Sequence, residues 1–360
     1  MKTLQKPVPP GGTIGIIGGG QLGRMLALAA ARLGLKTCIY NDAPDAPAFQ
    51  VTPDSVSAPY DDLDALSIFA ARCDAVTFEF ENLPAHAIAH LESQVAVRPG
   101  AAALAITQDR LSEKTFVAKL GLKTAPFFEV SSVEQARAAF AKLGGRGIIK
   151  TRRFGYDGKG QAKVAGAEET VAAFEKFKAP AILEGFVDFA FEASVIAARG
   201  ADGAFAAYDP PENEHENHIL RRSTVPSRLS VAHVAEAKAI AKTIGDALDY
   251  VGVFAVELFV GSDGALLVNE IAPRVHNTGH WTIEACAVSQ FEQHIRAVAG
   301  WPLGDGVRHA DAVMENIIGA EADAWEALAR SGALHLYGKR ESRPGRKMGH
   351  LTRLSPLTKR

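Results

Sequence analysis

A strand, a tight glycine turn and a helix open this sequence and constrain its fold more than any other feature. The mostly apolar residues Thr13–Ile17 lead into GGGQLG (18–23), and a helical pattern follows that ends near Gly34. The segments 36–42 and 74–82 are predicted to be further strands, with an alanine- and leucine-rich helical stretch between them. Such alternation is typical of a parallel sheet covered by helices. We therefore predict an N-terminal, Rossmann-like α/β domain over residues 1–108.

The glycine turn itself leaves three interpretations open. Gly18, Gly20 and Gly23 match G-x-G-x-x-G, and Asp42 stands about 20 residues further on, where a dinucleotide-binding fold places its ribose-binding acid. A helix N-terminus also attracts other anions, because its backbone N–H groups are unpaired. Tight packing of the helix on the strand is the third interpretation. The turn alone does not decide between a dehydrogenase, another anion site and a structural role.

The predicted pattern of secondary structure changes after residue 190. Alternating strands and helices give way to longer strands joined by short turns. Asp202-Gly203 and Asp263-Gly264 each separate two strand-like runs, a strong hairpin signal, and an amphipathic helix lies between the two hairpins. A helix is also predicted from Thr107 to Leu120, with Gly121 as its stop, and short strands and turns over the last 60 residues. We predict a mixed α/β and α+β chain with parts at 1–108, 109–189, 190–300 and 301–360.

The second hairpin brings two carboxylates together. If Asp263 and Gly264 form a two-residue loop, Glu257 stands opposite Glu270 on one face of the sheet. Facing carboxylates cost roughly 0.2–1 kcal/mol, and more among the apolar neighbours found here. A cation between them would remove this cost: Mg²⁺ accepts one or two carboxylates and takes phosphate oxygens besides, and the neighbouring Asn269 adds a neutral oxygen. An arginine bridging the carboxylates, or a solvated sheet face, is the alternative.

A cationic, glycine-rich loop follows a short apolar strand in the middle of the chain. The strand GIIK ends at Lys150, and TRRFGYDGKGQ (151–161) continues it. Glycines permit a loop to move and to offer backbone N–H groups to an anion. Together with the acidic hairpin, this pattern favours a site for a nucleotide triphosphate. Alone, it would also fit a solvated basic turn.

Composition excludes several other classes of function. The net charge is −2, which gives no general attraction to nucleic acid or to anionic membranes. No apolar run approaches the ~18 residues of a membrane span, and the first 12 residues lack the apolar core of a secretion signal. Cys38, Cys73 and Cys286 match no metal or redox spacing, which favours a reduced, cytoplasmic protein. A basic stretch at 337–350 is predicted to present its cations to a single phosphate group.

These segments together resemble the ATP-grasp enzymes. GGGQLGRML, KTRRFGYDGKGQ, LEGFVDFAFEAS, NEIAPRVHNTGHW and RPGRKMGHL are similar, more narrowly, to the N5-carboxyaminoimidazole ribonucleotide synthetase family of purine biosynthesis. The resemblance extends from about residue 13 to 354; FGYDGKGQ and NEIAPRVHNTGHW are its most specific motifs. It implies an ATP-grasp fold with a pre-ATP-grasp domain in front and a small β-rich region behind.

The resemblance also implies roles for individual residues. The expected ATP contacts are Arg110, Lys150, Gly155, Tyr156, Asp157, Gly158, Lys159, Gly160, Gln161, Glu184, Gly185, Phe186, Val187, Glu192, His215, Asn269 and Glu270. The expected ligands of Mg²⁺, or of Mn²⁺ in its place, are Glu257, Glu270 and Asn269. The expected contacts with the ribonucleotide are Gly20, Gln21, Leu22, Glu79, Glu81, Tyr156, Arg274, His276, Asn277, Lys339, Arg346 and Lys347. The expected catalytic residues are Asp157, Arg274 and Lys347.

The implied reaction is the ATP- and bicarbonate-dependent carboxylation of aminoimidazole ribonucleotide through carboxyphosphate, by a homodimer with small-molecule partners only. The sequence departs from the family pattern in two places, which affects the assignment of roles to individual residues. One extra residue precedes Arg343 and bears on the role of Lys339, and the segment around His215 matches the family only loosely. A formate-dependent ribonucleotide transformylase or a biotin carboxylase-like subunit would share the nucleotide and metal parts. An NAD(P)-dependent oxidoreductase would explain the glycine turn and leave the acidic hairpin unexplained.

Overall fold

The computed structural model of the chain describes residues 6–155 and 158–358. Its N-terminal part is a parallel sheet, as predicted, with four strands in the order β3-β2-β1-β4. The strands are β1 (Thr13–Ile17), β2 (Lys36–Asn41), β3 (Asp54–Ser57) and β4 (Ala75–Phe78). Its helices are α1 (Gln21–Arg32), η1 (Pro47–Val51), α2 (Leu63–Ala70) and α3 (Ala85–Glu92). Because β4 ends at Phe78, Glu79 and Glu81 follow directly after the carboxyl end of a buried strand.

Two helices, not one, connect this part to the next. The predicted helix from Thr107 to Leu120 is wrong at its start: α4 (Ala101–Thr107) ends there and α5 (Arg110–Lys119) begins after a break. The break is caused by Asp109, whose Oδ1 accepts hydrogen bonds from Leu111 N at 3.0 Å and Ser112 N at 3.2 Å. An aspartate that caps a helix in this way satisfies donors that otherwise lack partners.

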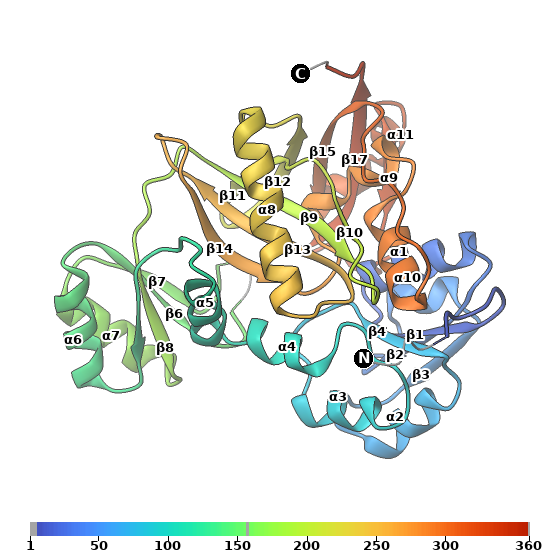
Figure 1. Cartoon of the computed structure of the whole chain (residues 1–360), viewed down its shortest axis with the longest axis horizontal. Coiled ribbons are helices and arrows are strands. Elements are labelled where there is room, and N and C mark those ends of the chain that lie inside the picture. Colours follow the sequence, from blue (N-terminus) through green and yellow to red (C-terminus); the bar gives the residue numbers. More distant parts are fainter. Residues whose placement is uncertain (1–5, 156–157, 359–360) are drawn as a thin grey trace.

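A small antiparallel sheet forms the second part, at the left of Figure 1. Its order is β5-β8-β6-β7, with β5 (Phe127–Val130), β6 (Gly147–Thr151), β7 (Gln161–Val164) and β8 (Ala181–Gly185). The helices α6 (Val133–Leu143) and α7 (Ala167–Phe177) pack against it. The inner position of β6 explains its apolar sequence, and the cationic loop leaves from the end of this strand.

The remaining strands form one nine-stranded sheet that runs through the centre of the molecule. It comprises β9 (Phe191–Arg199), β10 (Phe205–Ala207), β11 (Glu212–Glu216), β12 (Ile219–Val225), β13 (Gly252–Val260), β14 (Leu266–Ala272), β15 (Asp311–Ile318), β16 (Ala333–Leu336) and β17 (Lys347–Ser355). Its helices are α8 (Val231–Ala247), η2 (Asn277–Gly279), α9 (Thr282–Ala285), α10 (Gln290–Ala299), η3 (Gly319–Ala324) and α11 (Trp325–Ala329). None of the helices within the described ranges is long and apolar enough to cross a membrane.

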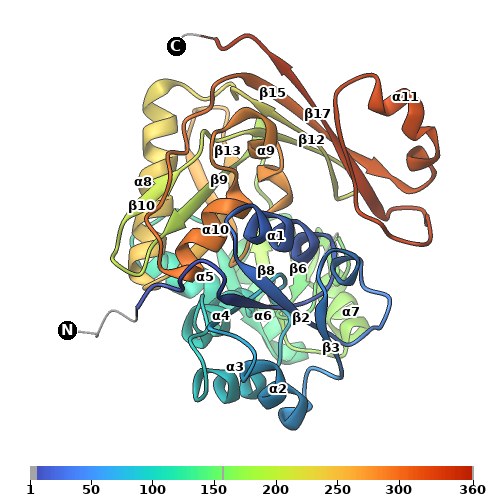
Figure 2. The same cartoon turned by 90° about the vertical axis from the view of Figure 1, so that its right-hand side faces the viewer.

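Both predicted hairpins are present in this sheet, as β9–β10 and β13–β14. The prediction of short strands over the last 60 residues is wrong, because β15 has 8 residues and β17 has 9. Figure 2 shows these two strands continuing the sheet beyond β12, so the C-terminal region extends the large sheet and is not a separate layer.

A buried histidine joins the N-terminal sheet to the large sheet. His294 on α10 accepts a hydrogen bond at Nδ1 from Val253 N at 2.9 Å, and its Nε2 lies 2.7 Å from Thr77 Oγ1. Since Nδ1 accepts, the single proton of the neutral ring is on Nε2 and is donated to Thr77. Burial lowers the pKa of His294 to about 3. The neutral ring therefore holds two sheets together.

This contact predicts a specific pH dependence of stability. The pKa of His294 is about 3 in the folded protein and about 6.5 in the unfolded chain, so acidification from pH 6.5 toward 3 favours the unfolded state. The contribution falls by about 1.4 kcal/mol per pH unit, or roughly 2 kcal/mol by pH 5. We expect His294→Gln to be less stable than the wild type at pH 7.5 and to lose most of that difference by pH 5, measured by urea unfolding. An equal difference at both pH values would contradict this account.

Candidate active site

Glu257 and Glu270 of the acidic hairpin face each other as predicted, but the loop between their strands and the register near it differ from the prediction. Glu257 on β13 is opposite Glu270 on β14. The loop, however, is longer than two residues, since Val260 pairs with Leu266. The register then shifts between Glu257 and Leu258, which leaves Asn269 as the extra residue of a β-bulge. The longer loop and the bulge change the register in opposite directions, so the two carboxylates still face each other.

The two carboxylates differ in their pKa. Burial, and next the charge of Glu270, raise the pKa of Glu257 to about 8. Burial would also raise the pKa of Glu270, but Arg110 outweighs it and holds this pKa at about 2. Arg110 Nη1 lies 3.0 Å from Glu270 Oε2. No bridging of both carboxylates by this arginine is found, since Glu257 Oε1 instead faces His276 Nε2 at 3.2 Å.

The residues at the bulge fit a divalent cation. Besides the two carboxylates, the buried Oδ1 of Asn269 has no hydrogen-bond partner among the described residues. An orphaned oxygen beside two crowded carboxylates is what a missing cation would leave. The described residues contain no group of three or more His, Cys, Asp or Glu side chains arranged around a metal position. The donor set therefore suits Mg²⁺, which completes its shell with waters and phosphates, better than a metal enclosed by protein ligands.

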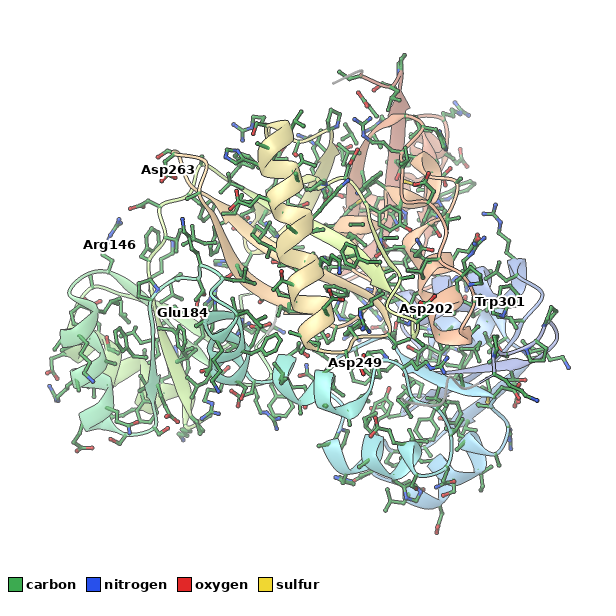
Figure 3. All side chains as sticks on the ribbon, in the orientation of Figure 1. Arg146, Glu184, Asp202, Asp249, Asp263 and Trp301 are labelled. Atoms are coloured by element: carbon green, nitrogen blue, oxygen red, sulfur yellow. The ribbon has the colours of Figure 1, made fainter. Side chains whose placement is uncertain are left out.

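Lys150 and Glu184 form the second part of the site. Lys150 Nζ donates to Glu184 Oε2 at 2.9 Å, and Lys114 Nζ lies 3.6 Å from the same oxygen. Burial opposes the charge on Glu184, but the two lysines outweigh it and lower its pKa to about 2. Figure 3 places Glu184 between the small sheet and the rest of the molecule. The structure thus leaves one carboxylate between two cations at the end of β6, where a phosphate group can compete for Lys150.

The glycine-rich loop reaches from the small sheet to the large one. Gly158 and Gly160 have φ values of 79° and 71°, which only glycine adopts readily. A side chain at Gly158 would place its Cβ 2.7 Å from the ring of His218, in the turn between β11 and β12. Tyr156 and Asp157 lie outside the described residues. The described part of the loop therefore contacts the large sheet as well as the small one.

Two backbone N–H groups at the end of β8 are paired within the protein. The N–H groups of Gly185 and Phe186 donate to the carbonyls of Pro126 and Arg146, at 2.8 and 3.0 Å. On the neighbouring strands, His215 Nδ1 lies 2.6 Å from Glu192 Oε2. Burial disfavours the charged ring of His215, but Glu192 raises its pKa overall.

The glycine turn is occupied by the protein's own carboxylate. Glu79 accepts hydrogen bonds from the N–H groups of Gly20 and Gly23, the latter at 2.5 Å. A Cβ at Gly18 would lie 2.4 Å from Glu79 Cγ, and one at Gly20 would lie 2.6 Å from Oε1. The glycines admit Glu79 to the N-terminus of α1, so these amides are not available to the phosphates of a dinucleotide. Of the three interpretations, the structure shows close internal packing at this turn, with the Glu79 side chain at the helix N-terminus, and burial raises the pKa of this carboxyl group.

Glu81 and Arg274 form a bidentate ion pair next to the acidic hairpin. Arg274 Nη2 donates to Glu81 Oε1 at 3.1 Å, and Nε donates to Oε2. Burial would lower the pKa of Arg274, but Glu81 keeps the guanidinium charged. The adjacent His276 is neutral, because burial, and next the charge of Arg274, lower its pKa to about 3. Asn277 forms a reciprocal amide pair with Asn316, at 2.8 and 3.0 Å.

A polar cavity of about 450 Å³ joins the glycine turn to the basic C-terminal stretch. Its wall includes Lys339 and Arg346 together with Gly20, which lies more than 300 residues before them in the sequence. Lys339 Nζ also donates to the carbonyl of Lys347 at 2.8 Å. Gln21 begins α1 next to this cavity, whereas the side chain of Leu22 packs in the apolar core and leaves only its backbone for a ligand.

Comparison with known proteins decides the family. The ribonucleotide synthetase preATP-grasp domain matches residues 12–108, the ATP-grasp domain 115–291 and the phosphoribosylaminoimidazole carboxylase C-terminal domain 312–359. N5-carboxyaminoimidazole ribonucleotide synthase of Brucella melitensis is 54% identical over 354 residues, which cover 97% of this chain and 98% of that protein. The chain belongs to the N5-carboxyaminoimidazole ribonucleotide synthase family.

Solved structures of this family share the whole fold. An N5-carboxyaminoimidazole ribonucleotide synthetase in complex with ADP has a TM-score of 0.93 and 41% identity, covering 98% of this chain and 94% of that one. The enzyme of Aspergillus clavatus, in complex with ADP and 5-aminoimidazole ribonucleotide, has a TM-score of 0.90 and 30% identity, covering 96% and 94%. The predicted fold class, an ATP-grasp fold with a pre-ATP-grasp domain and a small C-terminal region, is confirmed.

Sequence reasoning missed two buried charges in the site, Glu113 and Lys114 on α5. They are 2% and 1% exposed, although charged side chains on a short helix usually face solvent. Their spacing of three and four residues from Arg110 places all three on neighbouring positions of the helix surface. The spacing indicates that Glu113 and Lys114 are buried only once Arg110 is known to face the interior.

Proposed function

We propose that this protein catalyses the ATP-dependent carboxylation of 5-aminoimidazole ribonucleotide to N5-carboxyaminoimidazole ribonucleotide, a step of purine biosynthesis, with bicarbonate as the carbon source. The observation that carries the proposal is the position of the Glu257–Glu270 pair. Arg110 and His276 contact this pair on its two sides, and Arg274 follows it on the same segment. Family membership supports the activity, and the Aspergillus clavatus relative holds both ADP and the ribonucleotide.

In this proposal Arg110, Lys150 and the 155–161 loop bind the phosphates of ATP, and Glu184–Val187, Glu192 and His215 surround its nucleoside. Glu257, Glu270 and Asn269 hold Mg²⁺, which when bound neutralises phosphate oxygens for displacement. Lys150 supplies a further positive charge where negative charge develops. The link between Lys150 and Glu184 keeps the ammonium at the end of β6 until phosphate is present.

The first chemical step forms carboxyphosphate. An oxygen of bicarbonate attacks the γ-phosphorus of ATP, the bond from that phosphorus to the bridging oxygen breaks, and ADP leaves. Carboxyphosphate hydrolyses readily in water, so the active site must exclude solvent. The contact between the loop at Gly158 and His218 supports a covering role for the loop, because it joins the two sheets that enclose the nucleotide.

The second step transfers the carboxyl group. Carboxyphosphate breaks into CO₂ and phosphate, and the exocyclic amine of the ribonucleotide attacks CO₂ and then loses a proton. We propose Asp157 as the proton acceptor, on the resemblance alone, since it lies outside the described residues. Arg274 and Lys347 hold the anionic species, while Gly20, Lys339 and Arg346 in the polar cavity bind the ribonucleotide.

The organisation of the protein completes the proposal. We propose functional parts at 1–108, 109–189, 190–300 and 301–360, a homodimer as the working unit and a cytoplasmic location. The first boundary agrees with the end of the matched preATP-grasp domain at residue 108. The last two parts share one sheet through the pairing of β12 with β15, so we expect them to unfold together.

The decisive test is ADP release from ATP and bicarbonate, measured with and without 5-aminoimidazole ribonucleotide. We expect strong stimulation by the ribonucleotide that disappears when Mg²⁺ is removed by a chelator. Stimulation by formate or by a different amine acceptor, with none by the ribonucleotide, would overturn the proposed substrate and keep the ATP-grasp chemistry.

A further inference from the structure

Strand β14 carries the proposed metal ligands and is the edge strand of the large sheet. One side of it pairs with β13, so the backbone groups on its other side need partners from elsewhere. Helix α5 and the segment after it supply them. Val268 N donates to Lys123 O at 2.8 Å, Lys114 Nζ donates to Val268 O at 3.3 Å, and Ile271 N donates to Glu113 Oε1 at 2.6 Å.

The spacing of these contacts depends on the bulge. In a regular strand every second residue points its N–H and C=O groups to the same side, so Val268 would be followed by Glu270. Here the outward groups belong to Val268 and Ile271, three residues apart, because the extra residue Asn269 shifts the alternation by one. Glu113 and Lys114 are therefore both satisfied only when the bulge lies at Asn269–Glu270.

We propose that Glu113 and Lys114 are positioning residues that fix the bulge and so hold Asn269 and Glu270 in place for the metal–nucleotide complex. This inference rests on the proposed function. In this proposal each residue acts through the backbone on the outer side of the metal ligands. Arg110, one turn earlier on α5, contacts Glu270 directly, so one helix sets both the charge and the backbone position of that ligand.

The burial of the pair argues against a purely electrostatic role. Lys114 is 1% exposed, and its Nζ is closer to the carbonyl of Val268, at 3.3 Å, than to Glu184, at 3.6 Å. Glu113 is 2% exposed, and the contact found for its Oε1 is with a backbone N–H, not with a cation. Glutamine has the same shape and can accept the same hydrogen bond, which provides a conservative variant.

The test measures how much Mg²⁺ tightens the binding of ADP. Calorimetric titration of the full-length protein with ADP, in Mg²⁺ and in EDTA, gives the ratio of the two dissociation constants. We expect Glu113→Leu and Lys114→Met each to reduce this ratio by roughly tenfold, since residues that orient metal ligands typically contribute that much to metal affinity. Glu113→Gln should stay within about twofold of the wild type, because the acceptor for Ile271 is retained. Glu292→Leu on α10, which removes an equally buried carboxylate away from β14, is the matched control and should leave the ratio unchanged.

A second readout is independent of nucleotide. Hydrogen exchange of the 266–272 segment should be faster in Glu113→Leu and in Lys114→Met than in Glu113→Gln. An unchanged ratio in Lys114→Met and in any folded Glu113→Leu would overturn the proposal, and so would the absence of a Mg²⁺ effect in the wild type. Failure of the proposed function looks different: the wild type would show Mg²⁺-dependent ADP binding without stimulation of ADP release by the ribonucleotide.

Discussion

Glu270→Gln is expected to lower ribonucleotide-stimulated ADP release by roughly 10³-fold, or about 4 kcal/mol in the barrier. Glu270 is the ionised member of the carboxylate pair, because Arg110 holds its pKa at about 2. The substitution keeps the shape of the side chain and removes the charge that a divalent cation requires. It also leaves Arg110 without its carboxylate, so the guanidinium is free to bind phosphate in a non-productive position. The rate should be measured at saturating ATP and ribonucleotide over a range of Mg²⁺ concentrations.

Two comparisons make this result specific. Glu292→Gln removes a buried charge outside the site and should keep the wild-type rate, which controls for a general effect of losing a carboxylate. Thermal unfolding should show that Glu270→Gln remains folded, since the hairpin retains its backbone pairing. If Glu270→Gln kept more than about a tenth of the wild-type rate at any Mg²⁺ concentration, the charge at position 270 would not be essential and the assignment of the metal site would be wrong.

The carboxylate pair also shows which features of the site can be predicted from the sequence and which cannot. The Asp263-Gly264 signal correctly located a hairpin, but the apolar neighbours indicated burial only in part, since the side chain of Glu257 is 16% exposed and that of Glu270 is 36% exposed. The predicted two-residue loop was wrong, yet Glu257 still faces Glu270 because the bulge at Asn269 compensates for the longer loop. Loop length and bulge position depend on contacts outside the hairpin, here with α5 and the segment after it. A single strand pattern contains no information on those partners.

The glycine turn illustrates a different limit. Its pattern left a dinucleotide site, another anion site and tight packing open, and nothing local indicates that the turn contacts Glu79, which is 59 residues away from Gly20. Parallel pairing of β1 with β4 brings the end of one strand beside the turn after the other. The same reasoning applies to the polar cavity, where Gly20 meets Lys339 and Arg346. Motifs identified the chemistry of each segment, and only the topology determined which segments meet.

Arg274→Met is the variant with the second-largest expected effect, a loss of roughly 10²–10³ in kcat/KM for the ribonucleotide. This is the size expected when one charged group that stabilises the reacting species is removed. The same substitution leaves Glu81, 28% exposed, without its bidentate partner. We expect a loss of about 2–3 kcal/mol in the free energy of unfolding, because charge-assisted hydrogen bonds of this kind are lost while the carboxylate stays largely desolvated. The activity and the stability should therefore fall together in the single variant.

A double variant separates the two effects. Glu81→Gln in the Arg274→Met background removes the unpaired charge, so the free energy of unfolding should recover by at least half. The kcat/KM for the ribonucleotide should not recover, since the guanidinium is still absent. If activity returned together with stability, Arg274 would act only by neutralising Glu81. The cation that holds the carboxylated species would then be expected in the C-terminal basic stretch. If neither returned, Glu81 would itself have a role beyond orienting Arg274. The interaction energy from this cycle thus distinguishes a binding arginine from a structural one.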